Sequence, residues 1–189
     1  MPLPQEKPYT YGDLLAWDDG KHYELYDGAL VAMASPSDVH QEILFEIGRQ
    51  LGNFLVGKPC KAYPSPFDVR LFDTDKDRPE DSETVLQPDL IVVCDKSKVD
   101  RYGVHGAPDL VIEILSPSTQ ERDWREKYAL YQKAGVREYW ICDPVGRFVA
   151  VHILRDGQYS NPIFYTWSAK VPVSIWDDFS LDLSTVFPE

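Results

Sequence analysis

The 189-residue sequence predicts a mixed α/β fold in a single domain. Two apolar segments of strand length, each opening with Pro-Asp-Leu, and a stretch of helical periodicity predict this class. A second helix is expected between the later of these strands and another strand, an arrangement that favours a parallel crossover. The expected order is a β-hairpin, a helix, three strands, a helix, a strand and a C-terminal β-meander.

The chain is expected to begin with a β-hairpin followed by a helix. Residues 23–26 and 29–33 flank Asp27-Gly28, which is a strong signal for a two-residue hairpin turn. Over residues 37–55 the apolar side chains share one face at 100° per residue, which predicts an amphipathic helix. His40 projects into this apolar stripe in the first turn of the helix.

Three strands are expected next, over residues 62–72, 86–94 and 109–116. The segment 73–83 is polar and charged, and we expect it to be an exposed loop between the first two strands. The loop before the third strand holds Lys96, Lys98, Arg101 and His105.

The second helix is expected to run from a capping box at Ser118 to Ala134, where Gly135 stops it. Residues 138–143 then predict a strand, which Pro144 ends. From Arg147 onward the chain is expected to form a β-meander, with Asp156-Gly157 as a further hairpin turn.

Charge and length limit the possible functions. The chain has 19 basic and 31 acidic residues, a net charge of −12, which opposes non-specific attraction to nucleic acid. A nucleic-acid substrate would therefore need local basic patches or metal ions. No segment approaches membrane-spanning length and the N-terminus lacks signal-peptide features, so we expect a cytoplasmic protein without membrane contact.

The three cysteines, Cys60, Cys94 and Cys142, are odd in number and widely spaced. This pattern indicates neither a disulfide framework nor a zinc site, so we expect reduced core thiols. The sequence also lacks the Gly-x-Ser-x-Gly motif of serine hydrolases and the Gly-x-x-x-x-Gly-Lys loop of nucleotide-binding proteins.

Glu113 is a lone carboxylate inside an apolar run, where it should have a partner or an ion. Asp89 is the obvious candidate, because two acids on neighbouring strands can hold a divalent cation through oxygen ligands. An antiparallel register in which paired residue numbers sum to 202 places Asp89 opposite Glu113, about 5 Å apart at Cβ. A one-residue slip would send the carboxylates to opposite faces. Asp109 would lie roughly 13 Å from Glu113, which makes it the weaker ligand.

Lys127 is expected to point inward from the second helix. On a helical wheel it lies 40° from Asp123, on the apolar side. Lys127 lies about 12 Å along the helix from Thr119, and Glu113 lies about 10 Å back along its strand from Ser116. Because the helix must fold back over the sheet after the turn at Ser116-Pro117, these similar lengths should bring the lysine to the glutamate. In metal-dependent phosphodiester cleavage, carboxylates hold Mg²⁺ or Mn²⁺ and a cation stabilises charge on the phosphate.

Pro88-Asp89, twenty-three intervening residues and Glu113 on a strand resemble the PD-(D/E)xK nuclease superfamily. A longer pattern over roughly residues 8 to 160 looks like the Uma-type restriction endonuclease family. It comprises Tyr23-Glu24-Leu25-Tyr26-Asp27-Gly28, His40, Pro88-Asp89-Leu90, Pro108-Asp109-Leu110-Val111-Ile112-Glu113-Ile114-Leu115-Ser116-Pro117-Ser118-Thr119, Asp123, Lys127, Tyr131 and Gly135-Val136-Arg137-Glu138-Tyr139-Trp140.

The resemblance implies a restriction-endonuclease-like core with a mixed sheet, formed by a helix, three strands, a helix and a strand. It implies metal-dependent hydrolysis of phosphodiester bonds in DNA, with Asp89 and Glu113 as ligands of Mg²⁺ or Mn²⁺. The superfamily signature has a lysine two residues after the acid, where this chain has Leu115. The basic role would pass to Lys127. This resembles other members of the branch, in which the lysine lies on the helix that follows the strand. A homodimer is expected from the need to engage two strands.

Each candidate residue also has a purely structural interpretation. Glu113 and Lys127 could form a buried ion pair, and Lys127 lies four residues after an acid on the same helix. His40 is expected to be a core histidine in preference to a residue that positions water or phosphate. Glu24 could brace the hairpin or lie near the metal. Tyr131 could orient Lys127 or a phosphate, but an aromatic residue on an inward helical face is more often part of the core. The competing function is a non-catalytic nucleic-acid-binding or regulatory module, favoured by the net acidity and by Leu115.

Overall fold

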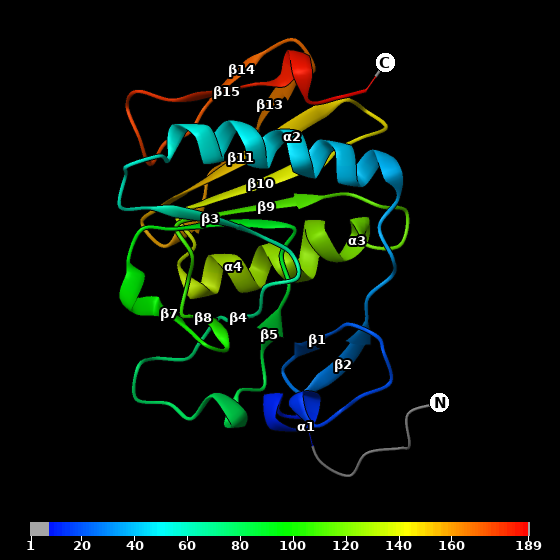
Figure 1. Cartoon of the computed structure of the whole chain (residues 1–189). Coiled ribbons are helices and arrows are strands. Elements are labelled where there is room, and N and C mark those ends of the chain that lie inside the picture. Colours follow the sequence, from blue (N-terminus) through cyan, green and yellow to red (C-terminus); the bar gives the residue numbers. More distant parts are fainter. Residues whose placement is uncertain (1–7, 189) are drawn as a thin grey trace.

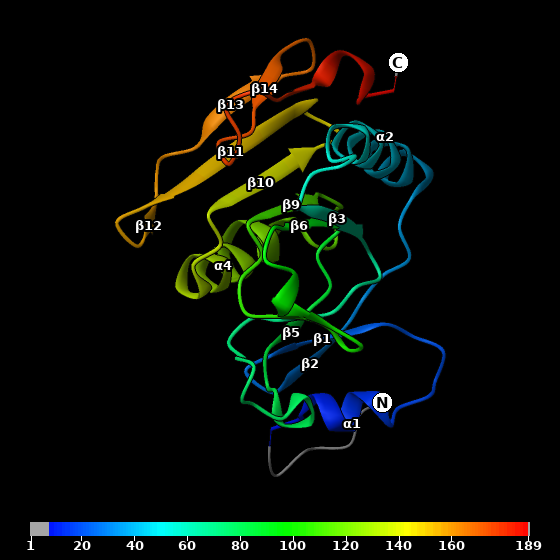
Figure 2. The same cartoon turned by 60° about the vertical axis from the view of Figure 1, so that its left-hand side comes forward.

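The computed structural model describes residues 8–188 and confirms the mixed α/β class. A central sheet has helix α2 along one face and the α3–α4 helical segment along the other, and a second sheet carries the N-terminal ribbon (Figure 1). A view turned by 60° keeps these helices on opposite sides of the central sheet (Figure 2). Among the described residues two large apolar cores result, one beneath α2 and one that α4 shares with the second sheet, and a small third cluster is formed by Tyr11, Leu25 and Val85.

The central sheet has the strand order β12-β11-β10-β9-β6-β3, and β13 also pairs with β11. Strands β9 and β10 are parallel, as the strand–helix–strand pattern predicts, and the other pairs in this sheet are antiparallel. Alternate residues of β9 face opposite cores, so Ile112 packs on the α2 side and Val111 on the α4 side. The strands are β3 (Lys61–Pro64), β6 (Leu90–Val93), β9 (Leu110–Ile114), β10 (Glu138–Asp143), β11 (Phe148–Arg155), β12 (Gln158–Tyr159) and β13 (Ile163–Thr166).

The register between β6 and β9 is the one that was expected. Leu90 lies opposite Ile112, and every pair in this ladder sums to 202. One further step along the same ladder places Asp89 opposite Glu113. The two carboxylates therefore start from adjacent positions on one face of the sheet.

Helix α2 (Asp38–Phe54) confirms the first predicted helix. Its N-cap is Ser37, whose hydroxyl oxygen accepts the backbone N–H of His40 at 3.2 Å. The apolar stripe packs on the central sheet through the buried residues Ile43, Leu44, Ile47 and Leu51. His40 lies in the first turn, at the end of this stripe.

The second helical segment consists of three parts. They are α3 (Gln120–Arg122), a π-helical turn η3 (Asp123–Lys127) and α4 (Tyr128–Ala134), after which Gly135 adopts a left-handed conformation with φ 89°. The predicted capping box at Ser118 is wrong, because Thr119 is the N-cap residue and makes no side-chain cap hydrogen bond. Its hydroxyl instead accepts the Ser116 N–H at 3.2 Å. Single π-helical turns inside helices often occur at functional sites.

The expected strands 62–72 and 86–94 are wrong as single strands, because each is divided between the two sheets. Pro66 and Pro88 lie at the two crossing points, and proline cannot donate to a strand ladder. The second sheet has the order β2-β1-β5-β4-β8-β7. Its strands are β1 (Tyr23–Tyr26), β2 (Ala29–Ala32), β4 (Val69–Arg70), β5 (Val85–Leu86), β7 (Val99–Asp100) and β8 (Gly103–His105).

The predicted hairpin of β1 and β2 is confirmed. Asp27 and Gly28 have φ angles of 46° and 78°, which the two-residue turn requires. A Cβ atom at Gly28 would also lie 2.3 Å from the Cβ of Pro8, so this position needs glycine for space as well. The short helix α1 (Tyr11–Leu15) before the hairpin was not predicted, since five residues show no periodicity.

The C-terminal part is antiparallel, but it is not one continuous meander. Strands β11, β12 and β13 belong to the central sheet, whereas β14 (Lys170–Pro172) and β15 (Ser180–Asp182) form a separate two-stranded ribbon. The predicted turn at Asp156-Gly157 is present between β11 and β12. The described part of the chain also contains three short 3₁₀ turns, η1 (Pro79–Asp81), η2 (Lys96–Lys98) and η4 (Leu183–Thr185).

The expectation of three reduced cysteines is wrong for two of them. Cys60 and Cys94 form a disulfide bond, while Cys142 is free and buried as expected. The cause is the register of β3 with β6, in which Lys61 pairs with Val93 and the cysteines just outside the ladder lie opposite each other. Sequence spacing alone does not show this pairing.

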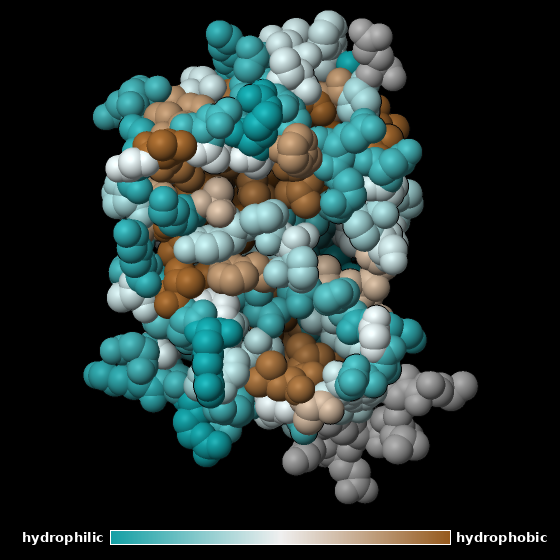
Figure 3. All heavy atoms as spheres, viewed as in Figure 1, coloured by the Kyte–Doolittle hydropathy of each residue, from teal (hydrophilic) through white to brown (hydrophobic). Residues whose placement is uncertain are grey.

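The surface seen in Figure 3 is mostly hydrophilic, with apolar side chains in separate areas. Across residues 8–188, no helix combines the length and the apolar character that a membrane crossing requires.

Candidate active site

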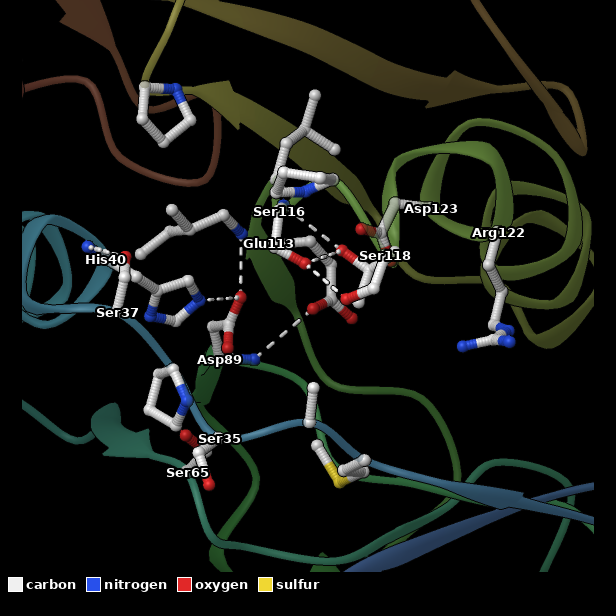
Figure 4. A pocket seen from close by; sticks show the side chains of 18 of the residues that line it. Ser35, Ser37, His40, Ser65, Asp89, Glu113, Ser116, Ser118, Arg122 and Asp123 are labelled. Carbon is white, nitrogen blue, oxygen red and sulfur yellow. Dashed lines mark hydrogen bonds and ion pairs between the residues drawn. The ribbon is translucent and has the colours of Figure 1, made fainter.

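Asp89 and Glu113 lie side by side at one end of the central sheet. The Asp89 N–H faces Glu113 Oε2 at 3.4 Å, and Asp89 Oδ2 accepts the backbone N–H of Ile114 at 2.7 Å. The close view of the pocket shows both carboxylates pointing into the same space (Figure 4). The chain enters this position from the second sheet through Pro88, so Asp89 is fixed at the junction of the two sheets.

Lys127 reaches this pair of acids from the π-helical turn. Its Nζ lies 2.9 Å from Glu113 Oε1, 3.1 Å from Glu24 Oε1 and 3.7 Å from Asp123 Oδ1. The predicted inward orientation is confirmed, since the side chain is 6% exposed. One ammonium is therefore surrounded by carboxylates from a strand of each sheet and from its own helix.

Glu24 comes to the cluster from strand β1 of the hairpin. Its Oε1 also accepts the backbone N–H of Gln87 at 2.9 Å, and its Oε2 accepts the hydroxyl of Tyr26 at 2.8 Å. Glu24 therefore contacts Lys127 in addition to bracing the hairpin. A role of Glu24 near a metal stays a prediction.

Tyr131 and His40 flank the acids on two sides. The Tyr131 hydroxyl donates to Glu113 Oε1 at 2.7 Å from a fully buried position on α4. His40 Nε2 lies 3.1 Å from Asp89 Oδ2, and its buried Nδ1 has no hydrogen-bond partner among the described residues. Tyr131 is thus both a core residue and a contact of Glu113. His40 contacts an acid of the site as well as the core.

Asp123 is a member of the cluster that the sequence analysis included in the family pattern but did not name among the site residues. It is 1% exposed, and its Oδ1 makes no hydrogen bond within the described part of the chain. The signal for it was present in the sequence, because an inward lysine brings an acid four residues earlier to a similar face.

Asp109 is not brought to the site. It precedes β9 at the opposite end from Glu113, where its carboxylate accepts the N–H of Cys94 at 2.8 Å and faces the Arg137 guanidinium at 3.1 Å. The second Pro-Asp motif therefore closes the far end of the strand pair.

The acids line a pocket of about 730 Å³ between the two sheets. Its walls come from the segments after β2 and β9, the first turn of α2 and the start of the second helical segment. Asp89 is 15% exposed in its side chain and meets solvent there, whereas Glu113 and Lys127 lie deeper. The side chains labelled in Figure 4 include several serines, namely Ser35, Ser37, Ser65, Ser116 and Ser118.

Burial dominates the protonation of the cluster. It raises the pKa of Glu113 well above its ordinary value, Lys127 opposes the rise, and Asp123, Asp89 and Glu24 add to it. Burial also raises the pKa of Asp123. Burial acts to lower the pKa of Lys127, but Glu113 and Glu24 outweigh this effect and place that pKa well above the usual range. The ammonium therefore keeps its proton at neutral pH and acts as a fixed positive charge.

The acidic pair fits a hard divalent cation. Within residues 8–188 no group of three or more His, Cys, Asp or Glu side chains is arranged to hold a metal ion. Mg²⁺ commonly uses one or two carboxylates together with water and substrate phosphate oxygens, so Asp89 and Glu113 match its smaller protein ligand set. Hydrogen bonds and ion pairs from the described residues reach Oδ2 of Asp89, and none of them reaches Oδ1.

Comparison with known proteins identifies the family of this chain and a solved structure with a similar fold. Residues 11–184 match the model of the family Uma2, whose description reads "Putative restriction endonuclease". The crystal structure of a putative nuclease belonging to DUF820 from Anabaena variabilis ATCC 29413 is similar in fold, with a TM-score of 0.73 and 20% sequence identity. That similarity covers 95% of this chain and 98% of the other.

A curated relative, the uncharacterized protein slr1290 of Synechocystis sp. (strain ATCC 27184 / PCC 6803 / Kazusa), is 29% identical over 132 residues. This match covers 69% of the present chain and 64% of the length of the relative.

Proposed function

The chain belongs to the Uma2 family, and from this premise we propose that it is a metal-dependent endonuclease that hydrolyses phosphodiester bonds in DNA. The observation that carries the proposal is the meeting of Asp89 and Glu113 in a pocket open to solvent, with the Lys127 ammonium 2.9 Å from Glu113. Metal-assisted phosphodiester cleavage uses this combination of groups.

In the proposed mechanism Asp89 and Glu113 would hold Mg²⁺ or Mn²⁺, which supplies an activated water and neutralises phosphate charge when bound. Lys127 stabilises negative charge that develops on the phosphate, since its raised pKa keeps it protonated. Tyr131 holds the Glu113 carboxylate through Oε1, while Oε2 faces the backbone N–H of Asp89 at 3.4 Å. His40 orients the Asp89 carboxylate from the opposite side.

Leu115 stands where the superfamily signature has its lysine. Its side chain lines the pocket and carries no charge. Lys127 reaches Glu113 from the neighbouring helical segment instead, and this contact supports the proposal that it has taken over the basic role.

The proposal is tested by nicking of supercoiled plasmid in Mn²⁺. We expect wild-type cleavage, and losses of at least about a hundredfold in Asp89→Asn, Glu113→Ala and Lys127→Ala. The matched control is Asp109→Asn, because Asp109 has the same Pro-Asp-Leu context but lies outside the pocket. It should cleave within a few-fold of wild type. Equal activity in all the proteins, or no activity in the wild type, rejects the enzymatic assignment.

The second candidate is a non-catalytic nucleic-acid-binding or regulatory module that retains the nuclease fold. The net charge of −12 and Leu115 favour it. DNA binding by a wild type that cleaves nothing in Mg²⁺ or Mn²⁺ would support this alternative.

We also propose a homodimer in the cytoplasm, because cutting both strands of a duplex calls for two copies of the site. Light scattering coupled to size-exclusion chromatography measures the mass directly, for comparison with 21.7 kDa for one chain.

A further inference from the structure

The pocket poses an electrostatic problem for an anionic substrate. Four carboxylates line it, from Glu24, Asp89, Glu113 and Asp123, and the Lys127 ammonium is already shared by three of them. With all four carboxylates ionised, two charges from a divalent ion would still leave this wall with one net negative charge. An additional cation is therefore needed to attract and hold a DNA strand.

Arg122 is the other side chain with a permanent positive charge among the described residues that line the pocket. It belongs to α3, directly before the π-helical turn that positions Asp123 and Lys127. Figure 4 shows it on the helical wall of the pocket, apart from the acids. Its position brings a guanidinium to the pocket without adding it to the carboxylate cluster.

The Arg122 guanidinium has no ion pair or hydrogen bond with another described side chain, although the protein is strongly acidic. Its carbon Cζ lies 5.7 Å from the centre of the Tyr26 ring, in a cation–π contact. Tyr26 is itself held by its hydrogen bond to Glu24. By contrast Arg125, one turn further on the solvent side, pairs with Glu121 at 3.4 Å.

We propose that Arg122 binds a phosphate of the DNA strand adjacent to the phosphate that is cleaved. This inference rests on the proposed nuclease function and specifies how the same pocket holds its substrate. The planar guanidinium can donate two parallel hydrogen bonds to phosphate oxygens, while the Tyr26 ring supports its face. Arg122 is thus a substrate-binding residue, and the reacting atoms remain with Asp89, Glu113 and Lys127.

The test compares Arg122→Gln, Arg122→Lys and the control Arg125→Gln in the full chain. Binding of a fluorescent duplex oligonucleotide is measured by anisotropy in Ca²⁺, between about 50 and 200 mM salt. Each phosphate contact contributes about 0.9 to the slope of log K against log salt. Arg122→Gln should make this slope shallower by that amount. Between about 50 and 200 mM salt, the DNA affinity of the variant should therefore fall about 3.5-fold less than the DNA affinity of the wild type.

The variants also separate charge from geometry. Arg122→Lys should keep most of the salt slope yet bind more weakly, because an ammonium cannot form the bidentate contact. In cleavage assays Arg122→Gln should raise KM roughly ten- to hundredfold with a smaller change in kcat. Arg125→Gln should match wild type in slope and KM. Urea unfolding of each variant checks that the fold is intact.

The outcomes distinguish this inference from the proposed function. DNA binding and cleavage by the wild type, with the same slope and KM in Arg122→Gln as in Arg125→Gln, overturn the role of Arg122 and leave the nuclease proposal standing. A wild type that neither binds nor cuts DNA overturns both. A reduced slope in Arg122→Gln that Arg122→Lys restores supports the phosphate contact, since a purely structural defect would not change the number of released ions.

Discussion

Replacement of Lys127 by methionine tests the buried charge cluster most directly. Methionine keeps much of the side-chain length but removes the ammonium that lies 2.9 Å from Glu113 and 3.1 Å from Glu24. Removing one partner of a buried ion pair typically costs about 3–5 kcal/mol. Because the free energy of unfolding of a domain is about 5–15 kcal/mol, we expect a large loss of stability at about pH 8.

The loss should become smaller as the pH falls. Burial raises the pKa of Glu113 and Asp123, and Lys127 is the group that opposes this rise. Without Lys127 both pKa values increase further, so the folded variant binds protons at a higher pH than the unfolded chain does. By linkage, the loss of unfolding free energy in Lys127→Met is smallest near the ordinary pKa values of Glu113 and Asp123, 4.5 and 3.8. The loss grows as the pH rises through the raised pKa values of these two groups in the folded protein.

The assay is urea unfolding followed by tryptophan fluorescence, at about pH 5 and about pH 8. The five tryptophans supply the signal. Lys133→Met is the control, since Lys133 is exposed on α4 and should leave the urea midpoint nearly unchanged. A cost below about 1 kcal/mol for Lys127→Met at pH 8, or the same cost at both pH values, would refute the reasoning.

Two further predictions concern other contacts. Tyr131→Phe removes the hydroxyl that donates to Glu113 at 2.7 Å, so the free energy of unfolding in the same urea assay should fall by about 1.5–3 kcal/mol; a change below about 0.5 kcal/mol would contradict it. Titration of the denatured, unreduced protein with a thiol reagent should detect Cys142 alone, because Cys60 and Cys94 are paired. Detection of all three thiols before reduction would show the pairing to be absent.

The site geometry was predictable where it depends on the register of two neighbouring strands and on the periodicity of one helix. A lone carboxylate in an apolar strand requires a partner, and only one register brings Asp89 to Glu113 on a common face. The register found between β6 and β9 is that one. The inward position of Lys127 likewise follows from the apolar face of its helix.

The errors in the predicted strands arose where one apolar segment of the sequence contributes strands to both sheets. Residues 62–72 and 86–94 each have the composition of one strand, yet Pro66 and Pro88 divide them between two sheets. Both halves of each run contain apolar residues, so periodicity alone could not show the division. The pairing of Cys60 with Cys94 depends on the register of a strand whose end was itself misplaced.

The π-helical turn explains how one helical segment brings three groups to Glu113: Asp123 and Lys127 line the pocket, and Tyr131 contacts Glu113 from a buried position. In a regular α-helix, positions spaced by four drift by 40° at each step, which would leave Tyr131 80° away from Asp123. Hydrogen bonds from residue i to i+5 place more residues in each turn, so part of this drift is cancelled before α4 begins. The π-helical turn thus reduces the angle about the helix axis between Asp123 and Tyr131. A redesign that deleted one residue from it would swing the acid and the hydroxyl out of line, even though every side chain of the site was retained.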